Sequence, residues 1–199
     1  MRCILTMGFL LCSQLGLSQQ NLVPNPSFEI IEFCPNSAGG IVSALPWRKV
    51  GGGGGVPLFH ECGWNGYGMP INWGGHQYPR TGLAYADVIN YITPYEDLIF
   101  EGNFIGVPLD SSLKEGHKYY VEFYINLMDS MLYATRNIGA HFSVTQPTDD
   151  IEVLLSLEPQ VQYSDSAYLS DKEGWMRING DFIAEGGESF ITIGNFDSH

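Results

Sequence analysis

Alternation of hydrophobic and polar side chains is clearest between Lys118 and Leu127. One side of the two-residue period carries Tyr119, Val121, Phe123, Ile125 and Leu127, and the other carries Lys118, Tyr120, Glu122, Tyr124 and Asn126. A half-buried antiparallel strand shows this pattern. We therefore predict that the first set packs on a core. The second set is either an ordinary solvated sheet face or a platform for a sugar ring.

The same period predicts further strands on both sides of this one. In Gly82–Ile92, we expect Ala84, Ala86, Val88 and Ile92 to face inward and Tyr85, Asp87 and Tyr91 to face outward. Further strands are predicted at Ser27–Ile31, Leu98–Leu109, Ile138–Thr145 with Val144 inward, and, more weakly, Ile151–Leu155, with a loop or edge segment at Gln160–Ser170. Trp175–Phe196 reads as a hairpin that turns at Glu185–Glu188.

Many short strands separated by turns predict an all-β protein, built as a two-sheet antiparallel sandwich. The 199 residues are 44% hydrophobic and only 16% charged, which fits one domain with a sizeable core. The net charge of −13 disfavours nucleic acid and anionic membrane surfaces as partners, because both repel an acidic protein. A neutral polymer or a divalent cation is compatible with this charge.

The first residues have the composition of a secretory signal. Met1–Ser18 contains a single Arg2, a short apolar run at Ile4–Leu11, and then small and polar residues. We therefore expect a mature chain of residues 19–199 that is secreted or displayed at the cell surface. The apolar run is too short to span a bilayer. Leu11 precedes Cys12 where lipoprotein signals have a small residue, which argues against lipidation.

Two cysteines, Cys34 and Cys62, remain after the signal. An even number in an exported chain favours one disulfide, worth on the order of 3–4 kcal/mol for a loop of this length. Two buried free thiols are the alternative. The nearby histidines, His60 and His76, lack the spacing of zinc ligands.

A long irregular segment, Val50–Arg80, contains five consecutive glycines and several aromatic residues. Aromatic loops in compact domains are usually functional or pack back over the sheet. Trp64 and Trp73 are therefore expected either to stack on sugar rings or to plug one end of the sandwich.

Several motifs carry a family resemblance. They are the opening Asn21–Glu29 (NLVPNPSFE) followed by Trp47, the segments Asn72–Ala86 and Lys114–Phe123, and a terminal pattern from Trp175 to Phe196. Together they resemble the jelly-roll carbohydrate-binding modules (galactose-binding-like domains), and in particular those of surface proteins exported by Bacteroidetes-type bacteria. The resemblance implies a two-sheet jelly roll, and it implies that Glu29 helps to hold a structural calcium ion.

The chain departs from this family at its end. Such domains normally continue to a last strand that pairs near the first and supplies a calcium ligand, whereas this sequence stops at His199. We therefore expect a C-terminally truncated module that lacks its closing strand, with an unpaired sheet edge. Without that strand, Glu29 would lack the second calcium ligand that this family supplies.

The leading functional hypothesis is a non-catalytic extracellular module that binds a carbohydrate polymer or glycan. Its candidate contact residues, chosen by outward phase or loop position, are Trp64, Trp73, Tyr85, Asp87, Tyr120, Glu122 and Tyr124. The alternative is a structural or adhesion spacer that is joined to other modules of a larger surface protein and has no sugar ligand.

An enzyme is the third hypothesis, and the sequence disfavours it. Trp64 stands where a zincin-like motif starting at His60 needs its second histidine. Carboxylates that could form a glycosidase pair, namely Asp149, Asp150, Glu173 and Glu188, are better explained as solvated turn residues. A role as the accessory part of a glycoside hydrolase would depend on a partner domain.

Overall fold

The computed structural model describes residues 20–88, 94–95, 98–99 and 102–196. The predicted signal segment Met1–Ser18, together with Tyr91 and Ile92, lies outside these residues. The elements in chain order are η1 (Gly40–Ser43), β1 (Arg48–Val50), β2 (Leu58–His60), β3 (Ile71–Asn72), β4 (Gly75–His76), β5 (Ala84–Ala86), β6 (Pro94–Tyr95), β7 (Leu98–Ile99), β8 (Phe104–Pro108), β9 (Lys118–Ile125), β10 (Ile138–Ser143), α1 (Ile151–Leu155), β11 (Val161–Gln162), β12 (Met176–Ile183) and β13 (Phe190–Asn195).

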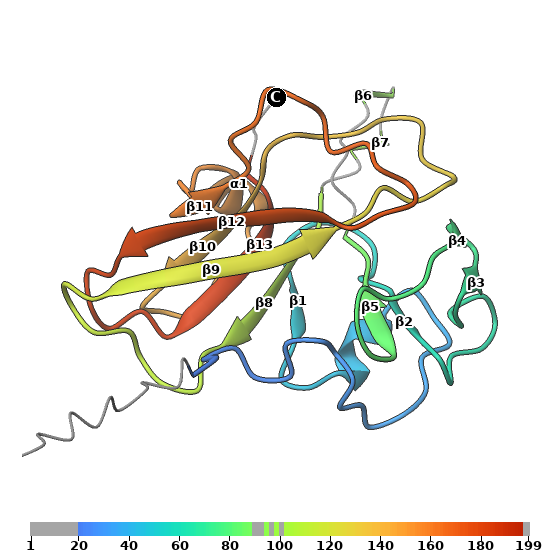
Figure 1. The fold of residues 1–199 in the computed structure, drawn as a ribbon, viewed down its shortest axis with the longest axis horizontal. Coiled ribbons are helices and arrows are strands. Elements are labelled where there is room, and N and C mark those ends of the chain that lie inside the picture. Colours follow the sequence, from blue (N-terminus) through green and yellow to red (C-terminus); the bar gives the residue numbers. More distant parts are fainter. Residues whose placement is uncertain (1–19, 89–93, 96–97, 100–101, 197–199) are drawn as a thin grey trace, which may run out of the picture.

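Two antiparallel layers face each other, which confirms the all-β prediction. One layer is a five-stranded sheet in the order β1-β8-β13-β10-β11, and the other pairs β12 with β9 along their whole lengths. Figure 1 shows β9 and β12 crossing in front of β8, β10 and β13. The jelly-roll connectivity itself stays a prediction.

The main core lies between these layers. Val121 of β9 is buried in the same cluster as Ile105, Ala140, Phe142 and Ile191 of the opposite sheet. Tyr119, Phe123 and Phe182 pack against this cluster from the two-stranded layer, and the Phe142 and Phe182 rings are 4.7 Å apart. The alternation predicted for Lys118–Leu127 is therefore confirmed over β9.

Strand β10 is confirmed, but its end was placed wrongly. Ile138, Ala140 and Phe142 are buried as predicted, whereas β10 ends at Ser143 and Val144 is 60% exposed. The side chain of Ser143 turns back to donate to the carbonyl of Thr145 at 2.8 Å, so the chain leaves the sheet there.

The predicted strand at Ser27–Ile31 is wrong, because Asn25 folds this segment into a loop. The Asn25 side chain accepts from the Ile30 amide at 3.0 Å and donates to the Ile30 carbonyl at 2.9 Å. The Trp47 indole donates to the Asn25 carbonyl at 2.8 Å, and its ring packs on Phe28. Side-chain hydrogen bonds of this kind compete with strand pairing.

Three other predictions need correction. Trp175–Phe196 is not a hairpin, because β12 pairs with β9 while β13 pairs with β8 and β10 in the other sheet. Ile151–Leu155 forms helix α1 and not a strand; its first turn is capped where the Asp150 carboxylate accepts from the Val153 amide at 3.4 Å, and Leu154 is buried against Val50 and Phe104. Leu98–Leu109 is not one strand, because Gly102 and Asn103 separate β7 from β8. None of the helices in the described part of the chain is long and apolar enough to cross a bilayer.

Beside the C-terminal end of β9 lies a region of short hairpins, which we call the hairpin region (residues 57–87). It pairs β2 with β5 and β3 with β4 (Figure 1). The predicted disulfide between Cys34 and Cys62 is present, with the two Cα atoms 5.5 Å apart. It fastens the N-terminal loop to the residues that follow β2.

Candidate ligand pocket

The outer face of β9 carries three of the candidate contact residues. The hydroxyls of Tyr120 and Tyr124 each donate to a different oxygen of the Glu122 carboxylate, both at 2.8 Å. Arg177 of β12 lies 3.6 Å from the same carboxylate. The two tyrosine hydrogen bonds hold the pKa of Glu122 below its usual range, and bonding to Glu122 raises the pKa of Tyr120.

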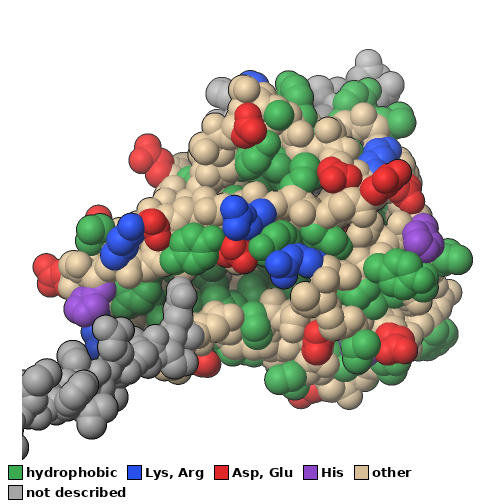
Figure 2. Space-filling view, viewed as in Figure 1, with side chains coloured by type: hydrophobic (Ala, Val, Ile, Leu, Met, Phe, Trp, Pro, Cys, Tyr) green, Lys and Arg blue, Asp and Glu red, His purple; other side chains and the backbone are tan. Residues whose placement is uncertain are grey.

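This face is already satisfied by its own side chains. The guanidinium of Arg80 lies over the Tyr124 ring, 3.5 Å from its centroid, so one face of that ring is covered. Figure 2 shows acidic, basic and hydrophobic side chains side by side over β9 and β12. A ligand here would have to displace contacts that the protein makes with itself, which lowers its net gain.

Tyr85 does not face outward as predicted. Tyr85 pairs with Phe59 in the two-stranded β2–β5 sheet, and its ring points inward, 5.0 Å from the Phe59 ring and 5.6 Å from the Trp175 ring. The Tyr85 hydroxyl accepts a hydrogen bond from Asn72 at 2.7 Å. Burial raises the pKa of Tyr85 to about 12.

Asp87, also predicted to face outward, is half-buried and lines a pocket. Its amide donates to the Pro57 carbonyl at 2.9 Å, which fixes the backbone beside β2. Among the described residues, none donates a hydrogen bond to its carboxylate, and burial raises the pKa of Asp87 to about 6. A half-buried carboxylate without protein donors is only partly compensated by water for the solvation that it loses.

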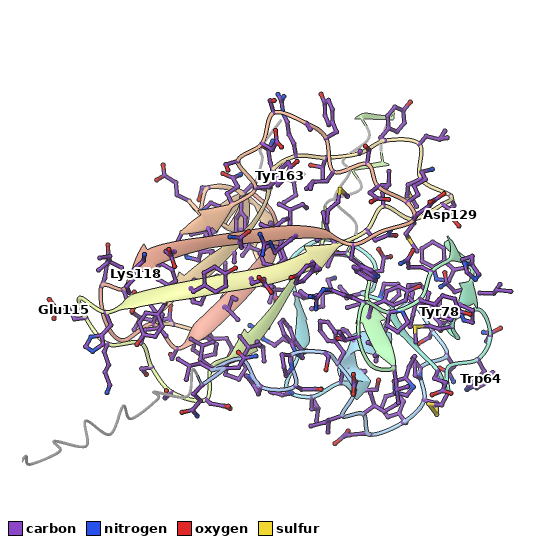
Figure 3. All side chains as sticks on the ribbon, in the orientation of Figure 1. Trp64, Tyr78, Glu115, Lys118, Asp129 and Tyr163 are labelled. Carbon is purple, nitrogen blue, oxygen red and sulfur yellow. A yellow bond between two sulfur atoms is a disulfide. The ribbon has the colours of Figure 1, made fainter. Side chains whose placement is uncertain are left out.

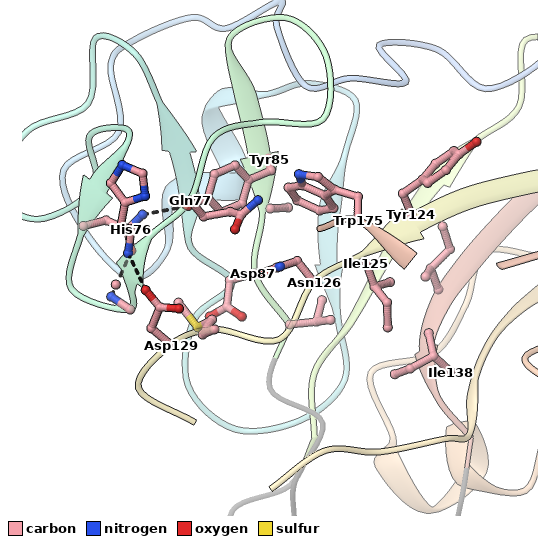
Figure 4. A pocket seen from close by; sticks show the side chains of 17 residues that line it. His76, Gln77, Tyr85, Asp87, Tyr124, Ile125, Asn126, Asp129, Ile138 and Trp175 are labelled. Carbon is pink, nitrogen blue, oxygen red and sulfur yellow. Dashed lines mark hydrogen bonds between the residues drawn. The ribbon is translucent and has the colours of Figure 1, made fainter. Parts of the chain in front are cut away.

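The pocket lies where the hairpin region meets the end of β9 (Figure 4). Its volume is about 120 Å³. The lining residues come from the β3–β4 hairpin, from β5 with the residues after it, from the end of β9 with Asn126–Asp129, and from Trp175 just before β12. Ile138 of β10 and Ile193 of β13 complete the lining. The lining residues with polar or aromatic side chains are Asn72, His76, Gln77, Tyr85, Asp87, Tyr124, Asn126, Asp129 and Trp175.

Glycines allow the segment after β9 to close this pocket. Gly74 lies against Met128, and Gly75, at φ +134°, lies against the Asp129 carboxylate, so a Cβ at either glycine would collide with these side chains. Asp129 accepts from the His76 amide at 2.8 Å, and Ser130 donates to the Gly74 carbonyl at 3.1 Å. The close approach explains why glycine occupies both positions of this turn.

Trp175 is positioned by hydrogen bonds around it. Its indole nitrogen donates to the Tyr78 carbonyl at 3.0 Å. Asn126 donates to the Gly174 carbonyl at 2.8 Å, and the Asp171 carboxylate accepts from the Glu173 and Gly174 amides, which lowers the pKa of Asp171. These hydrogen bonds therefore fix both the Trp175 indole and the backbone that precedes it.

Sequence reasoning missed several pocket residues. Trp175, Asn72 and Asp129 were not among the candidates, although Trp175 opens the terminal motif and Asn72 opens the Asn72–Ala86 motif. Asp129 follows the main strand without any motif of its own. The only signal that could have found it is the pair of glycines opposite.

The two loop tryptophans lie elsewhere. Trp64 is 60% exposed and does not line the pocket, and Figure 3 shows it at the rim of the hairpin region, away from Asp129. Trp73 is 46% exposed and packs one side on Phe59, with the ring centroids 5.9 Å apart. Of the seven candidates, the structure brings Tyr85, Asp87 and Tyr124 together in one pocket.

Glu29 is half-buried, and its carboxylate lies against Gly82. A search of the described residues finds no group of three or more His, Cys, Asp and Glu side chains that could hold a metal ion. The calcium ion therefore stays a prediction. Glu188, taken from the sequence as a solvated turn residue, is instead buried and accepts from the Glu185 and Gly186 amides at 2.8 Å each.

Comparisons with known proteins do not identify the chain: no family model, no curated protein and no solved structure matches it. The resemblance to jelly-roll carbohydrate-binding modules therefore stays a prediction, and function has to be argued from the pocket.

Proposed function

We propose that the chain is a non-catalytic extracellular carbohydrate-binding module whose pocket takes one sugar ring. The observation that carries this proposal is the Asp87 carboxylate, which lines the pocket without a hydrogen-bond donor from the described protein residues. Sugar hydroxyls are donors, and a hydrogen bond to a charged acceptor is stronger than one to a neutral acceptor. A bound ring would supply the donors that the fold leaves out.

The other lining groups suit the same ligand. Trp175 and Tyr85 offer apolar ring surface, while Asn72, Gln77 and Asn126 offer amides that can orient hydroxyls. A few polar groups among aromatic walls are typical of small-molecule sites. The 120 Å³ volume is smaller than the ~150 Å³ of an engineered cavity that admits benzene, so the pocket would enclose part of one sugar ring and the rest of the glycan would extend outward.

A structural or adhesion module is the second candidate. The satisfied network on β9 supports it, because Tyr120, Glu122 and Tyr124 are occupied with one another. Exposed apolar side chains such as Trp64 and Ile71, 60% and 75% exposed, could then meet a neighbouring module.

Calorimetric titration of the purified chain with a panel of monosaccharides and short glycans tests the proposal. We expect saturable binding by at least one sugar, loss of that binding in Asp87→Ala, and full binding in the control Asp110→Asn, since Asp110 is exposed and remote from the pocket lining. Absence of binding by every sugar would overturn the carbohydrate proposal and favour the structural candidate. Release of a hydrolysed product would overturn the non-catalytic part, because Asp87 and Asp129 share the pocket.

A further inference from the structure

The described side chains that line the pocket include two carboxylates and no lysine or arginine. The carboxylates are those of Asp87 and Asp129. Among the described lining residues, only His76 has a basic side chain. Two cations in the described part of the chain contact lining residues without lining the pocket themselves. Arg80 stacks on the Tyr124 ring, and the Lys172 ammonium donates to the Asp129 carbonyl at 2.8 Å.

The two carboxylates are not equivalent. Asp129 accepts a backbone hydrogen bond from His76 at 2.8 Å. Asp87 has no described donor and no ion-pair partner within 4.0 Å among the described residues. Hydrogen bonds to charged groups are worth more than neutral ones, and a carboxylate shielded from water gains most from a cationic donor.

Aromatic rings complete the environment. Trp175 and Tyr85 meet edge to face, 5.6 Å apart, on one wall of the pocket. Ring faces attract cations, and tryptophan does so most strongly. An ammonium group would therefore meet a carboxylate and aromatic rings in one small space, whereas a ligand carboxylate would meet Asp87 and Asp129 as like charges.

We propose that the pocket selects a sugar ring bearing a free protonated amine, of the 2-amino-2-deoxyhexose class, over the neutral, N-acetylated and uronic acid forms of the same ring. The amine lies at Asp87 and the ring lies against Trp175. This selectivity rests on the proposed carbohydrate function, and it names the class of sugar that the site takes.

Four sugars with the same ring separate the effects of a free amine, an N-acetyl group and a carboxylate on affinity. Glucosamine, glucose, N-acetylglucosamine and glucuronic acid are titrated at neutral pH into the wild-type chain and into Asp87→Asn. We expect glucosamine to bind about tenfold or more tighter than glucose, because a charge-assisted hydrogen bond replaces a neutral one. Glucuronic acid is expected to bind weakest. In Asp87→Asn, glucosamine and glucose should bind with similar affinity.

Tighter binding of glucose or N-acetylglucosamine than of glucosamine would overturn the proposal. A preference for glucosamine that is the same in wild type and in Asp87→Asn would also overturn the proposal. The control Asp110→Asn should keep the wild-type order, and thermal unfolding of each variant verifies that it is folded.

Binding of a simple amine distinguishes the proposed carbohydrate function from the proposed amine selectivity. Cyclohexylamine has a ring and an ammonium group but no hydroxyls. If no sugar binds while cyclohexylamine binds in an Asp87-dependent way, the carbohydrate function is wrong and the amine selectivity of the pocket stands. If neutral sugars bind but neither amine gains affinity through Asp87, the carbohydrate function stands and the amine inference is wrong.

Discussion

Glu122 and Asp87 both lie beside tyrosines, but their carboxylates differ in hydrogen bonding and in the direction of their pKa shifts. Glu122 lies on the outer face of β9 with both oxygens bonded to tyrosine hydroxyls, and its pKa is lowered. Asp87 lies in the pocket beside Tyr85 without a described donor, and burial raises its pKa. A carboxylate satisfied by its own fold is a structural group. A half-buried carboxylate without protein donors costs stability when it is ionised, and such a cost is typical of functional sites.

Removing the aromatic ring of Trp175 from the pocket wall should have the largest effect on stability and binding. Trp175→Ala removes a half-buried ring that packs on Tyr85 and donates to Tyr78. We expect a loss of about 2–3 kcal/mol in the free energy of unfolding, below the range for fully buried aromatic residues, together with loss of ligand binding.

Chemical denaturation of Trp175→Ala and Trp64→Ala measures this difference. Trp64 is 60% exposed, so its truncation should change the free energy of unfolding by about 0.5 kcal/mol or less. Equal losses in the two variants would show that the Trp175 wall is not a packed part of the fold.

Asp87→Asn should stabilise the protein while it weakens binding. Folding raises the Asp87 pKa from 3.8 to about 6, so the folded state prefers the protonated form and loses stability as the carboxyl ionises. Below pH 3.8 wild type and variant should be equally stable. Above pH 6 the variant should gain at most about 3 kcal/mol, because one pKa unit is worth about 1.4 kcal/mol.

Unfolding curves between acid and mildly alkaline pH check this sign. The other titratable side chains that line the pocket are His76, Tyr85, Tyr124 and Asp129, and they are unchanged in the variant. A stability difference that is constant with pH, or that favours the wild type above pH 6, would contradict the assignment of Asp87 as an uncompensated group.

Tyr85→Phe should give a smaller effect. It removes the hydroxyl that accepts from Asn72 at 2.7 Å and leaves the ring against Phe59 and Trp175. We expect a loss of about 1 kcal/mol in unfolding free energy, the usual value for one hydrogen bond. Thermal unfolding measures it, and Tyr168→Phe, on a 58% exposed tyrosine, is the matched control. No difference between the two would mean that the Asn72 bond adds nothing.

Glu122→Gln should have the smallest effect, although it disturbs the more prominent network. Its partners Tyr120 and Tyr124 can bond to water instead, because this face is solvated. We expect a Tm change of about 2 °C or less and unchanged ligand affinity. A large loss of affinity in this variant would move the binding site from the pocket to the outer face.

The sequence predicted the layers of the fold better than the site. Alternation identified the strands β9, β10, β12 and β13, because each strand has one face on the core. It did not predict that β12 and β13 belong to opposite sheets. The alternation did not predict the positions of Tyr85 and Asp87. A two-residue period divides a strand into two faces, but it does not say which later segment of the chain covers the outer face. Here Trp175 and Asn126–Asp129, far along the chain, cover it.

Local capping explains the other failures. Asn25 replaced a strand by a loop, and Asp150 allowed the mostly apolar segment Ile151–Leu155 to form a helix turn. Short apolar runs fit a strand or a helix equally well, so such side-chain contacts decide between them. Cys34 and Cys62 were predicted to pair because only two cysteines follow the signal segment.

The Cys34–Cys62 bridge also determines how the molecule responds to proteolysis. It spans the glycine loop Gly51–Gly55, in which Gly53 and Gly54 are exposed and lie between β1 and β2. Exposed glycine-rich loops are preferred sites for protease cleavage. A cut there would divide the chain into two pieces that stay covalently joined, with β1 still paired to β8. Such a nicked protein would run as one band on a non-reducing gel and as two bands after reduction.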